Sequence, residues 1–189
     1  FIEDYLRLPE AGWLLLVYFA CAIAGMPLWA WLARRYPKHR VWGGAMIYAC
    51  AVFVCVPLLG PGDLIGFTVI CVLTGLALSA DLALPPAIQA DVVDVDTAAH
   101  GEQRTGLYFA LWSVATKAAL AIAGGAALIV LDVAGFEAGA DNDAAALRTL
   151  VLLYAVAPVA LKLVAVAMMW GFPLDRAEHD RLRAAIEAG

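Results

Sequence analysis

Three charged side chains lie deep within strongly apolar stretches of the sequence: Asp81, Lys117 and Lys162. A charge inside a membrane-spanning helix is costly, and it usually marks a transport pathway, a binding site or an internal ion pair. These three residues are therefore the first candidates for chemistry in this chain.

Lys117 lies ten residues into the apolar stretch that begins at Leu107, which places it about 15 Å deep in a helix. Ser113 lies one turn earlier and Thr116 is adjacent, so the three form a polar strip on one helical face, flanked by Trp112. We interpret Lys117 as a substrate-facing ammonium that donates hydrogen bonds in a central cavity. The alternative is a structural lysine paired with a carboxylate on another helix.

Asp81 and Lys162 have less specific surroundings. Asp81 shortly precedes Pro85 and Pro86, which remove backbone donors and are expected to bend or break a helix. Its carboxylate is expected either to line the substrate cavity or to pair with Lys117 or Lys162. Lys162 has apolar neighbours on every side, which favours a structural role in the helical bundle or snorkelling toward water.

A polar segment over residues 91–106 carries a cluster of carboxylates, Asp91, Asp94 and Asp96, followed by Glu102 and Arg104. Spaced carboxylates can hold Mg²⁺, which leaves open a membrane enzyme acting on a lipid-linked substrate. No phosphate-cradling glycine motif lies beside them. We interpret Asp91, Asp94, Glu102 and Arg104 as a charge network that closes the cytoplasmic side of a transporter.

The elements that must position these residues are long and apolar. Of the 189 residues, 64% are hydrophobic and only 15% are charged, far from the balance of a soluble domain. A bilayer core of about 30 Å requires about 20 apolar residues in a helix. The sequence predicts an all-α integral membrane protein with spans near residues 12–33, 42–59, 64–84, 107–131 and 149–172.

Composition also narrows the function. The net charge of −5 is not concentrated in a basic patch, so nucleic acid is not expected as a partner. The four cysteines lie in apolar runs without C-x-x-C spacing, so we interpret them as small buried hydrophobes. We predict no metal site, no catalytic residue and no enzyme activity.

Basic residues indicate how the spans are oriented. Two, Arg7 and Arg148, lie on one side, and Lys117 and Lys162 lie within spans. The other side holds eight: Arg34, Arg35, Lys38, Arg40, Arg104, Arg176, Arg181 and Arg183. The connections at 34–40 and 91–106 and the C-terminal tail at 173–189 are therefore expected to be cytoplasmic. The five spans then place the N-terminus outside, and residues 1–11 are expected to end an earlier helix.

Residues 80–94 and 101–117 resemble the melibiose permease-like family of glycoside-pentoside-hexuronide:cation symporters, in the major facilitator superfamily. The similarity covers nearly the whole chain and is most specific from Gln89 to Lys117. It implies a twelve-helix bundle of two six-helix halves with the substrate between them. This chain would supply the C-terminal half: the end of the seventh helix and the eighth to twelfth, without the N-terminal half.

The resemblance also implies roles for single residues. Lys117 corresponds to the family's lysine near the sugar, and Ser113 to its polar neighbour one turn earlier. The family's cation-binding carboxylates lie in the N-terminal half, so the coupling Na⁺ or H⁺ is expected to bind there, and no cofactor is expected here. The sugar-contacting tryptophan of the family appears as Leu82, which argues against a galactoside. The cytoplasmic motif over 101–106 also has one Arg and one Glu fewer than the family's. Related vertebrate lipid transporters share the pattern.

The sequence therefore predicts a secondary transporter that moves a sugar or related small solute with a cation by alternating access. Its substrate is expected to bind near Lys117, Ser113, Thr116, Asp81 and Trp112. Its location is expected to be the plasma membrane, in a bacterium the inner membrane. The alternatives are the Mg²⁺-dependent membrane enzyme and a non-transporting sensor or scaffold derived from a transporter.

Overall fold

The computed structural model describes residues 1–8, 12–101 and 104–171, and every regular element in these ranges is helical. The helices are α1 (Trp13–Arg35), α2 (Lys38–Phe53), α3 (Leu64–His100), α4 (Thr105–Val133), α5 (Ala144–Val151) and α6 (Ala157–Met169). A 3₁₀ turn, Val56–Leu58, follows α2, and a π-helical turn, Leu152–Val156, joins α5 to α6. Counting these turns with their helices, five helices in the described ranges are long and apolar enough to span a membrane.

The five predicted apolar spans are present, but the third is much longer than its apolar stretch. We expected residues 91–106 to be a polar connection and Pro85–Pro86 to bend or break the helix. Instead α3 continues unbroken through both prolines to His100, so the expected break is absent and the expected connection is mostly helical. Two missing backbone donors are few among the bonds of a 37-residue helix, and membrane helices tolerate proline where neighbouring groups compensate.

Side chains and glycine define the ends of these helices. Asp63 caps the start of α3 by accepting a hydrogen bond from the Gly66 amide at 3.1 Å, and Asp143 does the same for α5 through the Ala146 amide at 2.7 Å. At the other end of α3, Gly101 has a φ of 72°. This left-handed conformation favours glycine and stops the helix.

Helices α1 and α3 pack closely because small residues lie where they cross. A Cβ atom at Gly75 would lie 2.5 Å from the Tyr18 carbonyl oxygen, and one at Gly25 would lie 2.5 Å from the Ser79 hydroxyl. Without a hydrophobic driving force in lipid, such close backbone contact is a main source of helix association. The Trp29 indole adds a hydrogen bond to the Leu76 carbonyl at 2.7 Å.

We expect Gly75→Val to destabilise the protein by about 1–3 kcal/mol, because the new side chain overlaps the α1 backbone. Gly124→Val on α4 is the matched control, since a Cβ there meets nothing within 4 Å in the described structure. The difference in stability between the two variants is measured by heating each protein in detergent and recording the temperature at which it aggregates. Equal shifts for the two variants would contradict the tight α1–α3 contact.

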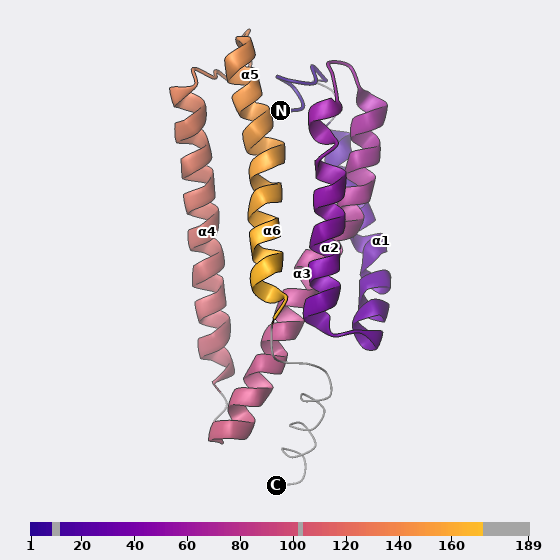
Figure 1. Ribbon diagram of the computed structural model, residues 1–189, viewed down its shortest axis with the longest axis vertical. Helices are drawn as coiled ribbons and strands as arrows, with labels where there is room; N and C mark the ends of the chain where they lie inside the picture. The colour runs from indigo at the N-terminus through magenta and orange to yellow at the C-terminus, as the bar shows by residue number, and fades with distance from the viewer. Residues whose placement is uncertain (9–11, 102–103, 172–189) are drawn as a thin grey trace.

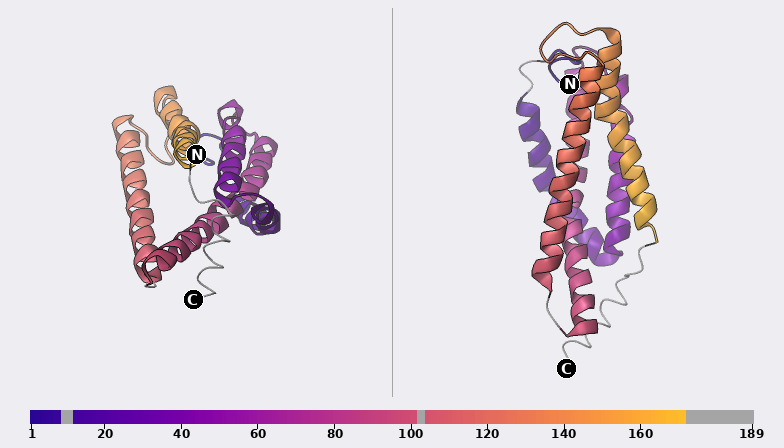
Figure 2. Two further views of the ribbon diagram at one scale, coloured as in Figure 1. Left: turned by 60° about the horizontal axis from the view of Figure 1, so that its bottom comes forward. Right: turned by 90° about the vertical axis from the view of Figure 1, so that its left-hand side faces the viewer.

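The helices α1, α2 and α3 form one packed group, and α6 and α4 lie beside it (Figure 1). α3 packs along α1 and α2 in its first part and then leans away from them to reach the start of α4. α6 packs against α2. α4 stands apart from α1 and α2 in Figure 1 and in the left view of Figure 2, and none of its residues is buried by the described part of the chain.

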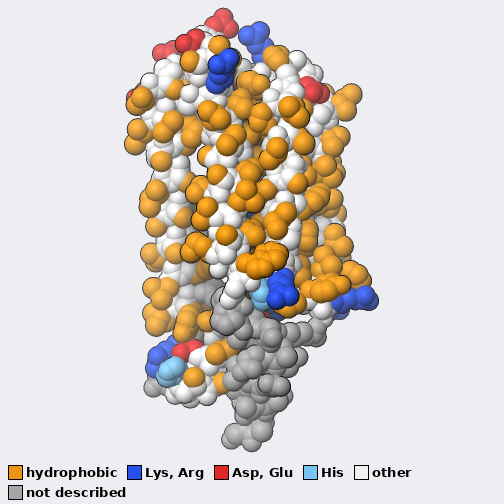
Figure 3. All heavy atoms as spheres, in the orientation of Figure 1, with side chains coloured by type: hydrophobic (Ala, Val, Ile, Leu, Met, Phe, Trp, Pro, Cys, Tyr) orange, Lys and Arg blue, Asp and Glu red, His pale blue; other side chains and the backbone are white. Residues whose placement is uncertain are grey.

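The surface of the bundle is apolar along most of its length, with charged side chains gathered toward the two ends (Figure 3). This distribution is typical of a protein surrounded by lipid hydrocarbon. The apolar surface includes large side chains of α4, such as Leu111, Val114 and Ile122, each more than half exposed. The fold is thus an integral membrane bundle, as the composition predicts.

Candidate functional site

Asp81 lies in a polar cluster between three helices. Its Oδ2 atom is 2.5 Å from the Lys162 ammonium of α6, and its Oδ1 atom accepts a hydrogen bond from the Trp42 indole of α2 at 2.8 Å. Both members of the ion pair are about one-third exposed in the described structure. Of the two lysine partners considered for Asp81, the structure therefore brings Lys162 to it.

A cavity of about 160 Å³ lies beside this ion pair. Its walls come from four helices, and the ion pair forms its polar part. The remaining walls carry apolar residues, the thiol of Cys50 and the hydroxyl-bearing side chains of Tyr18 and Thr74. Thr74 is bonded within its own helix, since its hydroxyl donates to the Ile70 carbonyl at 2.7 Å.

The second group of candidate residues lies on α4. Lys117, Thr116 and Trp112 are exposed and Ser113 is partly buried. The Thr116 hydroxyl donates to the Trp112 carbonyl at 2.8 Å, so it is occupied within the helix. Among the described residues, the Lys117 ammonium has no hydrogen-bond or ion-pair partner.

The predicted substrate-binding residues therefore separate into two places. Asp81 belongs to the α2–α3–α6 cluster, whereas Lys117, Ser113, Thr116 and Trp112 stay together on α4. Sequence reasoning missed Trp42 as a partner of Asp81. No local signal could have found it, because the two residues are 39 positions apart.

At the end of the bundle near residues 34–40, Asp91 contacts α2. The Lys38 ammonium lies 2.6 Å from the Asp91 Oδ1 atom and also donates to the Ala87 carbonyl at 3.3 Å. Lys38, which sequence reasoning counted only for orientation, therefore ties the start of α2 to α3. Asp94 and Arg104 each make further interactions, and Glu102 lies outside the described residues.

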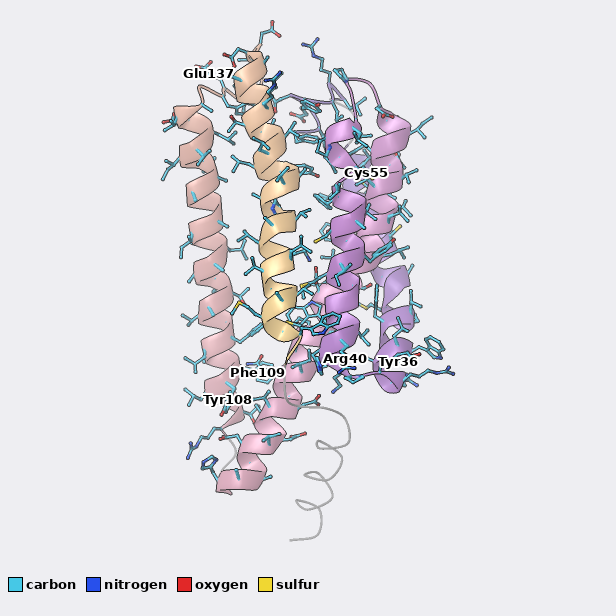
Figure 4. The ribbon with its side chains drawn as sticks, in the orientation of Figure 1. Tyr36, Arg40, Cys55, Tyr108, Phe109 and Glu137 are labelled. Atoms are coloured by element: carbon cyan, nitrogen blue, oxygen red, sulfur yellow. The ribbon has the colours of Figure 1, made fainter. Side chains whose placement is uncertain are left out.

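The remaining acidic residue of the cluster, Asp96, lies 3.0 Å from the His100 ring on the same helix. Nearby, the Gln89 side-chain amide donates to the Tyr108 carbonyl at 2.6 Å, which joins α3 to α4. Figure 4 shows Tyr108 and Phe109 at this meeting of the two helices. In the described ranges, no group of three or more His, Cys, Asp or Glu side chains is placed to hold a metal ion.

Comparison with known proteins matches this chain to one family and to several transporters. The family described as MFS/sugar transport protein matches residues 1–176. The chain is 27% identical over 180 residues to a sodium-dependent lysophosphatidylcholine symporter from Xenopus tropicalis, covering 92% of this chain and 34% of that protein. It is 23% identical to an uncharacterized symporter from Synechocystis, covering 100% of this chain and 36% of that protein.

A sphingosine-1-phosphate transporter from Mus musculus is also similar, at 26% identity over 161 residues, covering 82% of this chain and 32% of that protein. The chain thus spans about a third of the length of the curated relatives it matches. These relatives are transporters or symporters by description, and the two for which a solute is named differ in that solute.

Proposed function

We propose that this chain, which belongs to the MFS/sugar transport protein family, forms one wall of a secondary active transporter that moves a solute across the membrane by alternating access. The opposite wall of the transporter is formed by the N-terminal six-helix half that the family resemblance implies. The substrate binds between the two halves, on the face of α4 that carries Lys117.

One contrast between the two intramembrane lysines carries this proposal. Lys162 has a carboxylate partner at 2.5 Å, whereas Lys117 has no partner among the described residues and lies on a helix that buries no residue. An ammonium at mid-span needs an acceptor, because its desolvation is costly. Lys117 is therefore the donor available to a substrate, with Ser113 and Trp112 beside it.

The Lys117 ammonium favours a substrate that carries oxygen atoms able to accept its hydrogen bonds. Hydroxyls of a sugar, a carboxylate of a uronide and a phosphate ester all accept hydrogen bonds from lysine. The family description names sugar transport, while two relatives are named as transporters of lipids that carry a phosphate group. We propose a sugar-like or phosphate-bearing solute, moved with Na⁺ or H⁺ that binds in the N-terminal half.

The proposed cytoplasmic closure uses the contacts at the end of α3. Lys38 and Asp91 hold α2 against α3 there, Asp94 lies in the last two turns of α3 and Arg104 directly precedes α4. Glu102 is proposed for the same network from the sequence. We place this end, with the C-terminal tail, on the cytoplasmic side of the plasma membrane, as the distribution of basic residues indicates.

Uptake by the full-length protein in proteoliposomes tests the function. An imposed inward Na⁺ or H⁺ gradient is expected to drive accumulation of one of three solutes: a neutral glycoside, a hexuronide or a lysophospholipid. Dissipating the gradient with an ionophore should remove the accumulation. Absence of uptake of all three by correctly folded protein would instead support a sensor or scaffold.

A further inference from the structure

A groove on the surface of the bundle lies away from the sites described above. It has a volume of about 490 Å³ and lies between α5 and the 3₁₀ turn after α2. Pro57 and Tyr5 form one side. The other side is a stripe of α5 and the π-helical turn: Ala144, Leu147, Arg148, Val151 and Leu152.

The groove is polar at one level and apolar below it. Arg148 lies four residues from the start of α5, about 6 Å along the helix axis. Leu147 flanks Arg148 at the same level, and Val151 and Leu152 continue the wall toward the centre of the span. A guanidinium near a helix end, with apolar walls deeper in the membrane, matches the arrangement of a phospholipid headgroup above its acyl chain.

The guanidinium of Arg148 has no partner within the described ranges. The nearest acidic residue in sequence, Asp143, uses its carboxylate to cap α5 through the Ala146 amide. Arginine binds phosphate well because its planar fork donates parallel hydrogen bonds. The side chain is therefore available to an anion at the membrane interface.

We propose that this groove binds an anionic phospholipid of the surrounding leaflet, with its phosphate on Arg148 and an acyl chain along Val151 and Leu152. A zwitterionic headgroup brings a cation toward the guanidinium, so an anionic headgroup is favoured. This site is separate from the substrate-binding strip on α4, and it does not depend on the transported solute.

Native mass spectrometry of the full-length protein, delipidated in detergent and titrated with phosphatidylglycerol or phosphatidylcholine, tests the headgroup contact. We expect phosphatidylglycerol to bind more tightly, and Arg148→Gln to weaken its binding about tenfold, because a charge-assisted hydrogen bond is lost. Arg7→Gln is the matched control, since Arg7 is an exposed arginine that does not line the groove. Equal weakening in both variants would overturn the proposal.

The apolar part of the groove has its own pair of variants. Ala144→Trp fills the groove and is expected to reduce phosphatidylglycerol binding, whereas Ala145→Trp, which does not line it, should leave binding unchanged. Thermal unfolding verifies that both variants are folded. Unchanged binding in Ala144→Trp, or equal binding of the two lipids to the wild type, would show that the groove is not a specific lipid site.

Discussion

Replacing Lys117 with alanine is expected to raise the KM for solute uptake by the full-length protein about tenfold to a hundredfold, while leaving its expression and thermal stability nearly unchanged. The stability should be preserved because Lys117 makes no hydrogen bond or ion pair with the described residues. Uptake should weaken because the substrate loses a charge-assisted hydrogen-bond donor. Such a bond is worth about 1.5–3 kcal/mol, or about tenfold to a hundredfold in affinity.

Two further variants distinguish a substrate contact from a general effect on α4. Ile122→Ala removes a large side chain that is 71% exposed on the opposite face of the same helix, and it should retain uptake. Lys117→Arg keeps the charge but changes its shape, so it should raise the KM for uptake more than it lowers the maximal rate. Normal uptake by Lys117→Ala at normal expression would exclude the role proposed for Lys117.

Breaking the ion pair between Asp81 and Lys162 is expected to destabilise the protein rather than to abolish substrate binding directly. Asp81→Asn leaves the Lys162 ammonium without its carboxylate, and Lys162→Met leaves the carboxylate with only the Trp42 indole. Because both side chains are about one-third exposed, removing one partner should cost about 1–3 kcal/mol, between the values for exposed and buried pairs. Each single variant should therefore lower the unfolding temperature and the yield.

The double variant Asp81→Asn, Lys162→Met should be more stable than the sum of the two single effects predicts, because it leaves no unpaired charge. The same cycle with Lys117→Met in place of Lys162→Met provides the control, since Lys117 is not paired with Asp81. Thermal unfolding of the four proteins in each cycle measures the coupling. Additive effects in the Asp81–Lys162 cycle would mean that the contact contributes no stability.

Local features of the sequence were sufficient for the helical spans. An apolar stretch long enough to cross a bilayer is a property of consecutive residues, and each of the five predicted stretches contains a long apolar helix. The prediction was wrong at the end of α3, where polar residues after Ala90 were expected to form a connection. Polarity marks where a helix leaves hydrocarbon, but a helix can continue into water while its own backbone bonds are satisfied.

The pairing of the charged residues could not be predicted in the same way. Lys117 and Lys162 both lie in apolar stretches, and both were possible partners for Asp81. The choice depends on which helix packs beside α3 at that level, and α6 brings Lys162 there from 81 positions away. Trp42 reaches the same carboxylate from α2.

The three intramembrane charges that suggested chemistry at the outset thus have two different environments. Their place in apolar helices and the resemblance of the chain to symporters follow from the order of residues, because span length and motif similarity are local properties. The packing of the helices was needed to show that Asp81 and Lys162 pair with each other while Lys117 has no partner among the described residues. Ion pairing depends on distances of a few ångströms between helices, and these distances are set by packing.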